Sequence, residues 1–114
     1  MGKYRSKLQI IADILRVVEK DIRKTRIMYQ ANLSYKLLNW YLDRIIKAGL
    51  VKVSEGRLYT LTKKGETFLR KFEEYRLARR KAEQKIRQVQ SMRAELEAMC
   101  LISKSSDDLS TSQL

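Results

Sequence analysis

The feature that most constrains this fold is a long segment without a helix breaker. Residues 66–102 contain neither glycine nor proline, and the whole chain has no proline and four glycines. Thr62 is a suitable N-cap just before this segment. A helix of about 40 residues is roughly 60 Å long, which exceeds what a small domain can bury. The sequence therefore predicts one long helix, and an apolar stripe along it needs a partner.

Apolar residues in this segment recur at the spacing of a coiled coil. One seam position is held by Phe68, Tyr75, Ala82, Val89 and Leu96, and the other by Phe72, Arg79, Ile86, Arg93 and Cys100. In a parallel dimer each of the two seam arginines would face its own copy, and the like charges would repel. An antiparallel dimer instead sets Arg79 against the partner's Leu96 and Arg93 against the partner's Ala82. Both arginine stems then pack while both charges reach water.

We therefore predict an antiparallel homodimer through this helix. The residues expected at its interface are Phe72, Tyr75, Arg79, Ala82, Ile86, Val89, Arg93, Leu96 and Cys100. Cys100 is expected to be a small seam residue rather than a reactive thiol. Two alternatives stay open for this helix, namely a basic helix lying on DNA and an intramolecular clasp. The basic run over residues 76–81 is either a solvated face or a second DNA contact.

The first 50 residues predict three short helices, because apolar residues recur there at helical spacing. Their expected ranges are 7–20, 26–31 and 35–48, and their expected N-caps are Ser6, Thr25 and Ser34. Residues 20–24 lack this period and are expected to form a plain connection. Gly49 is expected to end the third helix, since glycine tolerates the left-handed conformation needed there. The second and third helices, joined by a three-residue turn, make a helix-turn-helix.

Residues 50–53 and 58–61 predict a β-hairpin, because both are apolar or alternating and a polar turn with a glycine joins them. A helix-turn-helix followed by such a hairpin is a winged helix. The expected fold class is thus mainly α, an α+β winged helix-turn-helix with a long C-terminal coiled-coil helix, in an elongated antiparallel homodimer. The expected parts are a DNA-binding domain at 1–65, the dimerising helix at 66–102, and a disordered tail at 103–114.

The charge of the chain points to a polyanionic partner. The formal net charge is +12, and residues 1–65 carry 15 basic against 5 acidic side chains, whereas residues 66–114 carry 10 against 8. Surface ion-pair networks of the thermophilic kind would give balanced signs, which residues 1–65 do not show. Histidine is absent and Cys100 is the single cysteine, which excludes a Cys/His zinc cluster and a histidine-based triad. We expect no enzymatic activity, no metal, no cofactor and no small-molecule ligand.

Several side chains are candidates for DNA contact. They are Lys24, Thr25, Arg26, Tyr35, Lys36, Asn39, Trp40, Arg44, Lys47, Lys52 and Arg57. On the third helix Lys36, Arg44 and Lys47 suit phosphates, and Asn39 has the chemistry to read adenine. Lys52 and Arg57 make the hairpin basic. Asp43 on the same helix face opposes phosphate contact.

Two groups among these candidates keep a structural alternative. Tyr35 and Trp40 either stack on nucleic acid or cover a neighbouring element. Lys24, Thr25 and Arg26 surround the start of the second helix, where backbone N–H groups favour a phosphate. They form either a backbone clamp or a merely capped, solvated helix end.

Several short motifs together resemble one protein family. The segments are Ser6-Lys7-Leu8, Lys24-Thr25-Arg26-Ile27-Met28-Tyr29, Ala31-Asn32-Leu33-Ser34-Tyr35 and Tyr59-Thr60-Leu61-Thr62-Lys63-Lys64-Gly65. In order and spacing the chain over residues 6–100 resembles the archaeal Sulfolobus ten-a DNA-binding proteins. The resemblance implies a winged helix with a C-terminal antiparallel coiled-coil dimer. It also implies an abundant chromatin or nucleoid protein of an archaeon.

Three functions remain open at this stage. The first is a sequence-tolerant architectural protein that binds double-stranded DNA in the cytoplasm, on the nucleoid, and has no membrane association. The second is a sequence-specific transcription regulator that reads two half-sites with Lys36 and Asn39. The third is a protein-interaction module of the transcription machinery, for which only Trp40 offers an apolar docking residue. Fold alone does not choose among them.

Overall fold

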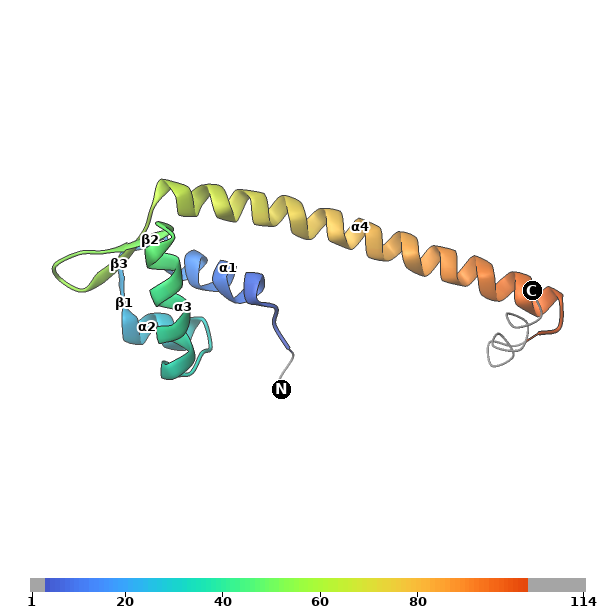
Figure 1. Ribbon diagram of the computed structural model, residues 1–114, viewed down its shortest axis with the longest axis horizontal. Coiled ribbons are helices and arrows are strands. Elements are labelled where there is room, and N and C mark those ends of the chain that lie inside the picture. The colour runs from blue at the N-terminus through green and yellow to red at the C-terminus, as the bar shows by residue number, and fades with distance from the viewer. Residues whose placement is uncertain (1–3, 103–114) are drawn as a thin grey trace. The chain divides into compact units, whose positions relative to one another are not determined.

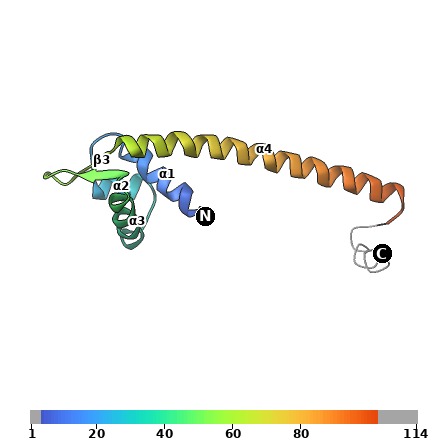
Figure 2. The same ribbon diagram turned by 45° about the horizontal axis from the view of Figure 1, so that its top comes forward.

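The computed structural model describes residues 4–102, in four helices and three strands of this part of the chain (Figure 1). In chain order they are α1 (Lys7–Val17), β1 (Ile22–Arg23), α2 (Lys24–Gln30), α3 (Tyr35–Lys47), β2 (Val51–Val53), β3 (Leu58–Leu61) and α4 (Lys63–Met99). The predicted winged helix with a long C-terminal helix is confirmed. Figure 2 shows α4 as one unbroken helix. The predicted disordered tail, 103–114, lies outside the described residues.

Three of the predicted N-caps are confirmed by their hydrogen bonds. Ser6 Oγ accepts from the Gln9 backbone N–H at 3.1 Å, and Ser34 Oγ accepts from that of Leu37 at the same distance. Thr62 Oγ1 accepts from the backbone N–H of Gly65 at 3.0 Å. Gly49 adopts the predicted left-handed conformation, with φ of 82° after the end of α3. These local signals depend on neighbours within four residues, which is why the sequence reveals them.

The predicted plain connection over residues 20–24 is wrong, because part of it is a strand. The sheet has the order β1-β3-β2, and both pairs are antiparallel. Ile22 pairs with Tyr59 and Arg23 with Leu58. A two-residue strand is too short to show alternation, and its pairing is supplied by β3, which is distant in sequence.

The β1 strand also changes where the neighbouring helices begin and end. Helix α1 ends at Val17, before the expected residue 20, and the carbonyl of the next residue, Val18, accepts from the backbone N–H of Leu61 in β3 at 3.1 Å. The predicted Thr25 cap is wrong as well. The N-cap of α2 is Arg23, which makes no side-chain cap hydrogen bond, and Thr25 lies inside the first turn.

The core of the first compact unit lies among the short helices and the sheet. Its fully buried large side chains are Ile14, Leu15, Val18, Ile27, Leu38, Ile45 and Val51. This unit extends to Tyr75 rather than to the expected boundary at residue 65, because the first turns of α4 contribute to it. Phe68 and Leu69 pack on the core.

Phe72 requires a correction to the expected dimer interface. Its side chain is only 6% exposed within the monomer, and its ring lies 5.9 Å from the guanidinium carbon of Arg16. A ring buried in this way has little surface left for a second chain. We therefore remove Phe72 from the seam and begin the candidate dimer contact at Tyr75, which is exposed.

Arg5 fastens the chain entering α1 to the end of α2. Its guanidinium donates to the Asp13 carboxylate at 2.9 Å, to the Ala31 carbonyl at 2.9 Å and to the Asn32 carbonyl at 2.8 Å. Helix α2 ends at this point, and carbonyls at a helix end lack partners within the helix. Within residues 4–102, no helix has both the length and the apolar character needed to cross a membrane.

A close approach at Gly65 generates the first prediction. A Cβ atom at this position would lie 2.4 Å from the Leu50 carbonyl oxygen and from Leu61 Cδ1. Helix propensity alone predicts that Gly65→Ala stabilises α4 by about 1 kcal/mol. We expect instead a loss of about 1–3 kcal/mol in the free energy of unfolding, because backbone must move to admit the methyl group. Urea unfolding followed by circular dichroism measures it.

Gly56→Ala is the matched control for this prediction. A Cβ at Gly56 would approach nothing closer than Ser54 Oγ at 4.0 Å. We expect its effect to stay within about 0.5 kcal/mol, as for an ordinary surface change. A stable Gly65→Ala variant would contradict the proposed close contact between the start of α4 and the Leu50 carbonyl.

Candidate nucleic-acid interface

A basic cleft lies where the start of α2, the start of α3 and the hairpin meet. Its volume is about 550 Å³, and it is lined by Arg23, Lys24, Thr25, Tyr35, Val53, Arg57 and Tyr59. We call this the wing cleft. Four of the predicted contact residues, Lys24, Thr25, Tyr35 and Arg57, line it together. The sequence alone does not reveal Arg23 and Tyr59 as cleft residues, because the pairing of β1 with β3 joins segments that are far apart in the chain.

The wing cleft holds three cations and no carboxylate. Arg23, Lys24 and Arg57 take part in none of the ion pairs of residues 4–102. Lys24 Nζ lies 4.9 Å from the centre of the Tyr35 ring. The hydrogen-bonding influence of Asn39, together with the Lys24 charge, holds the pKa of the Tyr35 phenol below its ordinary value. The cleft is therefore a positive environment that stabilises negative charge.

Arg57 stands at the hairpin turn in an unusual backbone conformation. Its φ is 61°, a left-handed value, whereas Gly56 in the same turn does not need one. The turn is closed by the Arg57 N–H, which donates to the Ser54 carbonyl at 2.9 Å. A non-glycine residue in this region costs about 1–2 kcal/mol. The chain thus carries an arginine where a glycine would be less strained.

The recognition helix α3 is divided into two halves by its ion pairs. In the C-terminal half Asp43 pairs with Lys47 at 3.3 Å and with Arg44 at 3.8 Å, so these two predicted phosphate contacts are partly neutralised. In the N-terminal half Lys36 is exposed and Asn39 is half-buried. The N-terminal half, which also supplies Tyr35 to the wing cleft, is the more positive one.

Trp40 both packs and remains accessible. The Arg44 guanidinium carbon lies 3.5 Å from its ring centre, and the ring meets Tyr41 edge-on at 4.9 Å between centres. The side chain is nevertheless 42% exposed. It lines a second opening of about 450 Å³ together with Lys7, Ser34, Lys36, Leu37 and Tyr41. Both alternatives for Trp40, packing and contact with a ligand, therefore keep structural support.

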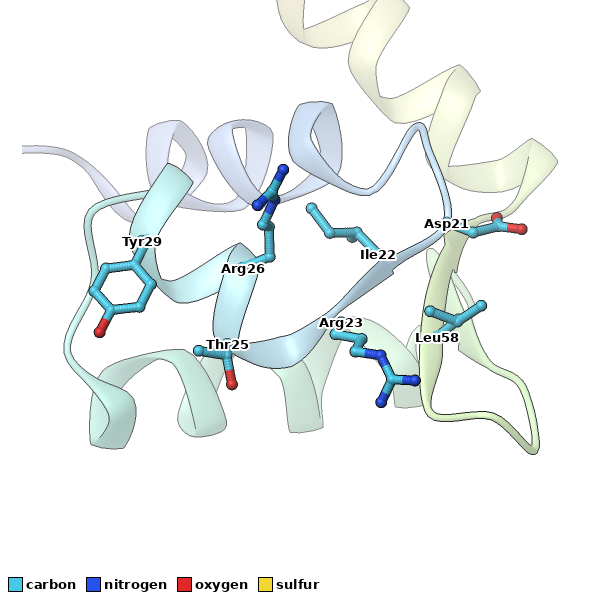
Figure 3. A pocket seen from close by; sticks show the side chains of 7 residues that line it. All are labelled: Asp21, Ile22, Arg23, Thr25, Arg26, Tyr29 and Leu58. Atoms are coloured by element: carbon cyan, nitrogen blue, oxygen red, sulfur yellow. The ribbon is translucent and has the colours of Figure 1, made fainter.

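Arg26 and Lys52 lie apart from the wing cleft. Arg26 lines a third opening, of about 580 Å³, with Asp21, Ile22, Arg23, Thr25, Tyr29 and Leu58. Figure 3 shows the Arg26 side chain pointing away from those of Arg23 and Thr25. Arg26 does not line the wing cleft, whereas Arg23 lines it together with Lys24 and Thr25. Lys52 is exposed on β2, where it pairs with Thr60 in the sheet.

Comparisons with known proteins bear on this arrangement. The winged helix-turn-helix family matches residues 4–80. Two uncharacterized proteins of Methanocaldococcus jannaschii are similar in sequence. MJ0290 is 42% identical over 71 residues, which cover 61% of this chain and 33% of that protein. MJ0287 is 35% identical over 63 residues, or 54% of this chain and 64% of that protein, so the chain spans less than two thirds of either relative.

A solved structure is similar over a larger share of the fold. It is the crystal structure of Sso10a-2, described as a DNA-binding protein from Sulfolobus solfataricus. The TM-score is 0.70 and the sequence identity is 30%, and the match covers 77% of this chain and 96% of that one.

The strained conformation of Arg57 leads to the second prediction. In Arg57→Gly, relief of about 1–2 kcal/mol of left-handed strain exceeds the about 0.4–1 kcal/mol that glycine costs through the unfolded chain. We expect the free energy of unfolding to rise by about 0.5 kcal/mol, measured by urea unfolding. Arg57→Ala removes the same charge without relieving the backbone, and it should show no gain. Equal stability of the two variants would contradict strain at this turn.

Proposed function

We propose that this chain, which belongs to the winged helix-turn-helix family and, with Sso10a-2, to the Sulfolobus ten-a group, binds double-stranded DNA through the wing cleft and α3. The observation that carries the proposal is the set of three cations in the wing cleft, which have no carboxylate partner. A site of this kind suits the phosphates of a duplex, whose neutralisation releases counterions and supplies affinity. The tyrosine hydroxyls of the cleft add neutral hydrogen-bond donors.

The proposed binding is sequence-tolerant, as an architectural chromatin or nucleoid protein requires. Among the outward side chains of α3, Asn39 has the chemistry to read adenine, and it lies close enough to Tyr35 to lower the pKa of that phenol. Lys36 has the chemistry to read guanine or to contact a phosphate. Arg44 and Lys47 are drawn toward Asp43. The contacts that remain go mainly to phosphates, which fix position without reading sequence. The alternative, a regulator that reads an operator, needs Asn39 and Lys36 released toward bases.

We further propose that two copies of the chain dimerise through residues 75–100 of α4 as an antiparallel coiled coil. Apolar side chains at the seam are exposed in the monomer, with Ile86 at 55% and Leu96 at 63%. Contiguous apolar surface of this kind is normally covered. Val89, Met92 and Met99 extend the same exposed surface.

Both seam arginines have conformations compatible with this dimer. Arg79 Nε donates to Glu83 at 3.0 Å, and Arg93 Nε donates to Glu97 at the same distance. Each guanidinium group is thus held by a glutamate one helical turn later, at a position that flanks the seam. The aliphatic part of each arginine can then lie along the seam. A stem in this place covers apolar surface of a partner, and its charge remains in water.

The DNA-binding proposal predicts a loss of affinity when the wing cleft is neutralised. The variant Arg23→Gln/Lys24→Gln/Arg57→Gln should bind a duplex roughly a hundredfold more weakly, because each charge-assisted contact contributes on the order of 1 kcal/mol. Fluorescence anisotropy with a labelled random duplex measures the change.

Lys20→Gln/Lys63→Gln/Arg70→Gln is the matched control for net charge. These three cations are exposed and line no part of the wing cleft. The control should lose only a few-fold in affinity, through the weaker long-range field. Equal losses in the two triple variants would mean that the wing cleft is not the DNA site.

The antiparallel register predicts a specific crosslink. In a Cys100→Ser background, a mixture of the single variants Ala82→Cys and Arg93→Cys should form a disulfide between the two chains, since these positions face each other. Gel electrophoresis without reductant measures it. Each single variant alone should stay uncrosslinked, and efficient linkage of position 82 to its own copy would rule out the register.

A further inference from the structure

The middle of α4 has an excess of positive charge that its average composition conceals. Between Glu74 and Glu95 the chain has seven basic residues and one acidic residue, Glu83. The carboxylates before and after this segment bring residues 66–114 close to neutrality. Dimerisation does not require such an excess.

Three of these cations share the side of the helix that is opposite the seam. At 100° per residue, Arg80, Arg87 and Lys81 fall on the face centred away from Ile86 and Val89. Gln84, Gln88 and Ser91 complete this face, and all six side chains are exposed. We call these six residues the outer basic face. Between residues 80 and 91 this side of the helix has no acidic and no apolar side chain, and Leu77 and Glu95 lie on the same side just before and after it.

The ion pairs of the helix do not include the outer basic face, although Glu83 lies one turn from both Arg80 and Arg87. Glu83 is bound to Arg79 at 3.0 Å, and Arg93 is bound to Glu97 at 3.0 Å, so the seam arginines have intrahelical partners. Arg80, Lys81 and Arg87 take part in none of the ion pairs found in the described part of the chain. A solvated helix face is ordinarily stabilised by alternating signs one turn apart. Here the residue one turn after Lys81 is Lys85, a like charge that destabilises the isolated helix.

We propose that the outer basic face is a second contact for the sugar–phosphate backbone of duplex DNA, separate from the wing cleft. The inference rests on the proposed DNA-binding function. Arg80 and Arg87 are about 10 Å apart along the helix axis, roughly the rise of three nucleotides on one strand. Two arginines at this spacing reach separate phosphates, and Gln84 between them adds a neutral donor. The charges of this face are spread along a rod, and the opening of about 330 Å³ that Arg80 borders is also lined by Glu83, a carboxylate. Such a face suits a repeating backbone better than a single small anion.

The outer basic face and the coiled-coil seam are compatible, since they lie on opposite sides of one helix. In the antiparallel dimer each helix would turn its outer basic face away from the other. The dimer would then present one such face on each side of the coiled coil. A duplex contact there would add to the affinity supplied by the wing cleft and would read no sequence.

The test compares the full-length variant Arg80→Gln/Lys81→Gln/Arg87→Gln with the charge-matched control Lys20→Gln/Lys63→Gln/Arg70→Gln. Duplex affinity is measured by anisotropy at several salt concentrations. We expect the outer-face variant to bind about tenfold more weakly than the control. We also expect the slope of log affinity against log salt to be shallower by about two, since each lost phosphate contact removes about 0.9. Glutamine keeps helix propensity, so circular dichroism and sedimentation should match the wild type.

The outcomes separate this inference from the function on which it rests. If the wild type binds no duplex, the proposed function fails. If the wing-cleft variant loses affinity while the outer-face variant equals its control in affinity and salt slope, the proposed function stands and the second contact is overturned. Unchanged duplex binding with a loss of binding to anionic vesicles would also overturn it, in favour of a membrane surface.

Discussion

The fold depends on one hydrogen-bonded junction, where the end of α3 meets the start of α4. Thr62 Oγ1 donates to the Gly49 carbonyl at 2.6 Å and accepts from the Gly65 N–H at 3.0 Å, and the Thr62 N–H donates to the Leu50 carbonyl at 3.1 Å. Both ends of the β2–β3 hairpin lie at this junction, so its hydrogen bonds fix the position of the wing and of the first turn of α4. Because Gly65 has no side chain, the backbones come close enough for these bonds.

The distribution of ion pairs, more than the number of charges, distinguishes the proposed binding surfaces from the rest of the protein. Arg5 is bound to Asp13 and to the end of α2, and Lys47 is bound to Asp43, so these cations serve the fold. The wing cleft and the outer basic face instead collect cations without carboxylates, which costs stability in the free protein through repulsion. A polyanion relieves that repulsion. The Arg57 turn also costs stability, because it places a charge on a residue whose backbone is in a strained left-handed conformation.

The sequence predicts the parts of this structure that depend on near neighbours. Ser6, Ser34 and Thr62 cap their helices as expected, and Gly49 takes its left-handed conformation. The errors all involve partners far apart in the chain. Strand β1 exists because β3 pairs with it, and this pairing brings Arg23 rather than Arg26 to the wing cleft. Phe72 fits the heptad as well as its neighbours do, and only packing on the first unit removes it from the seam. Sequence periodicity shows on which face of a helix a residue lies. It does not show which other element packs against that face, and burial depends on that packing.

We propose that this protein binds duplex DNA through phosphate contacts with little base readout. The most direct measurement is the dissociation constant of the full-length protein for two duplexes of unrelated sequence, over a series of salt concentrations. The account predicts two steep straight lines of log Kd against log salt that nearly coincide, because the same counterions are released from either duplex. Shallow lines would contradict binding through phosphates. Steep lines separated by several orders of magnitude would contradict sequence tolerance.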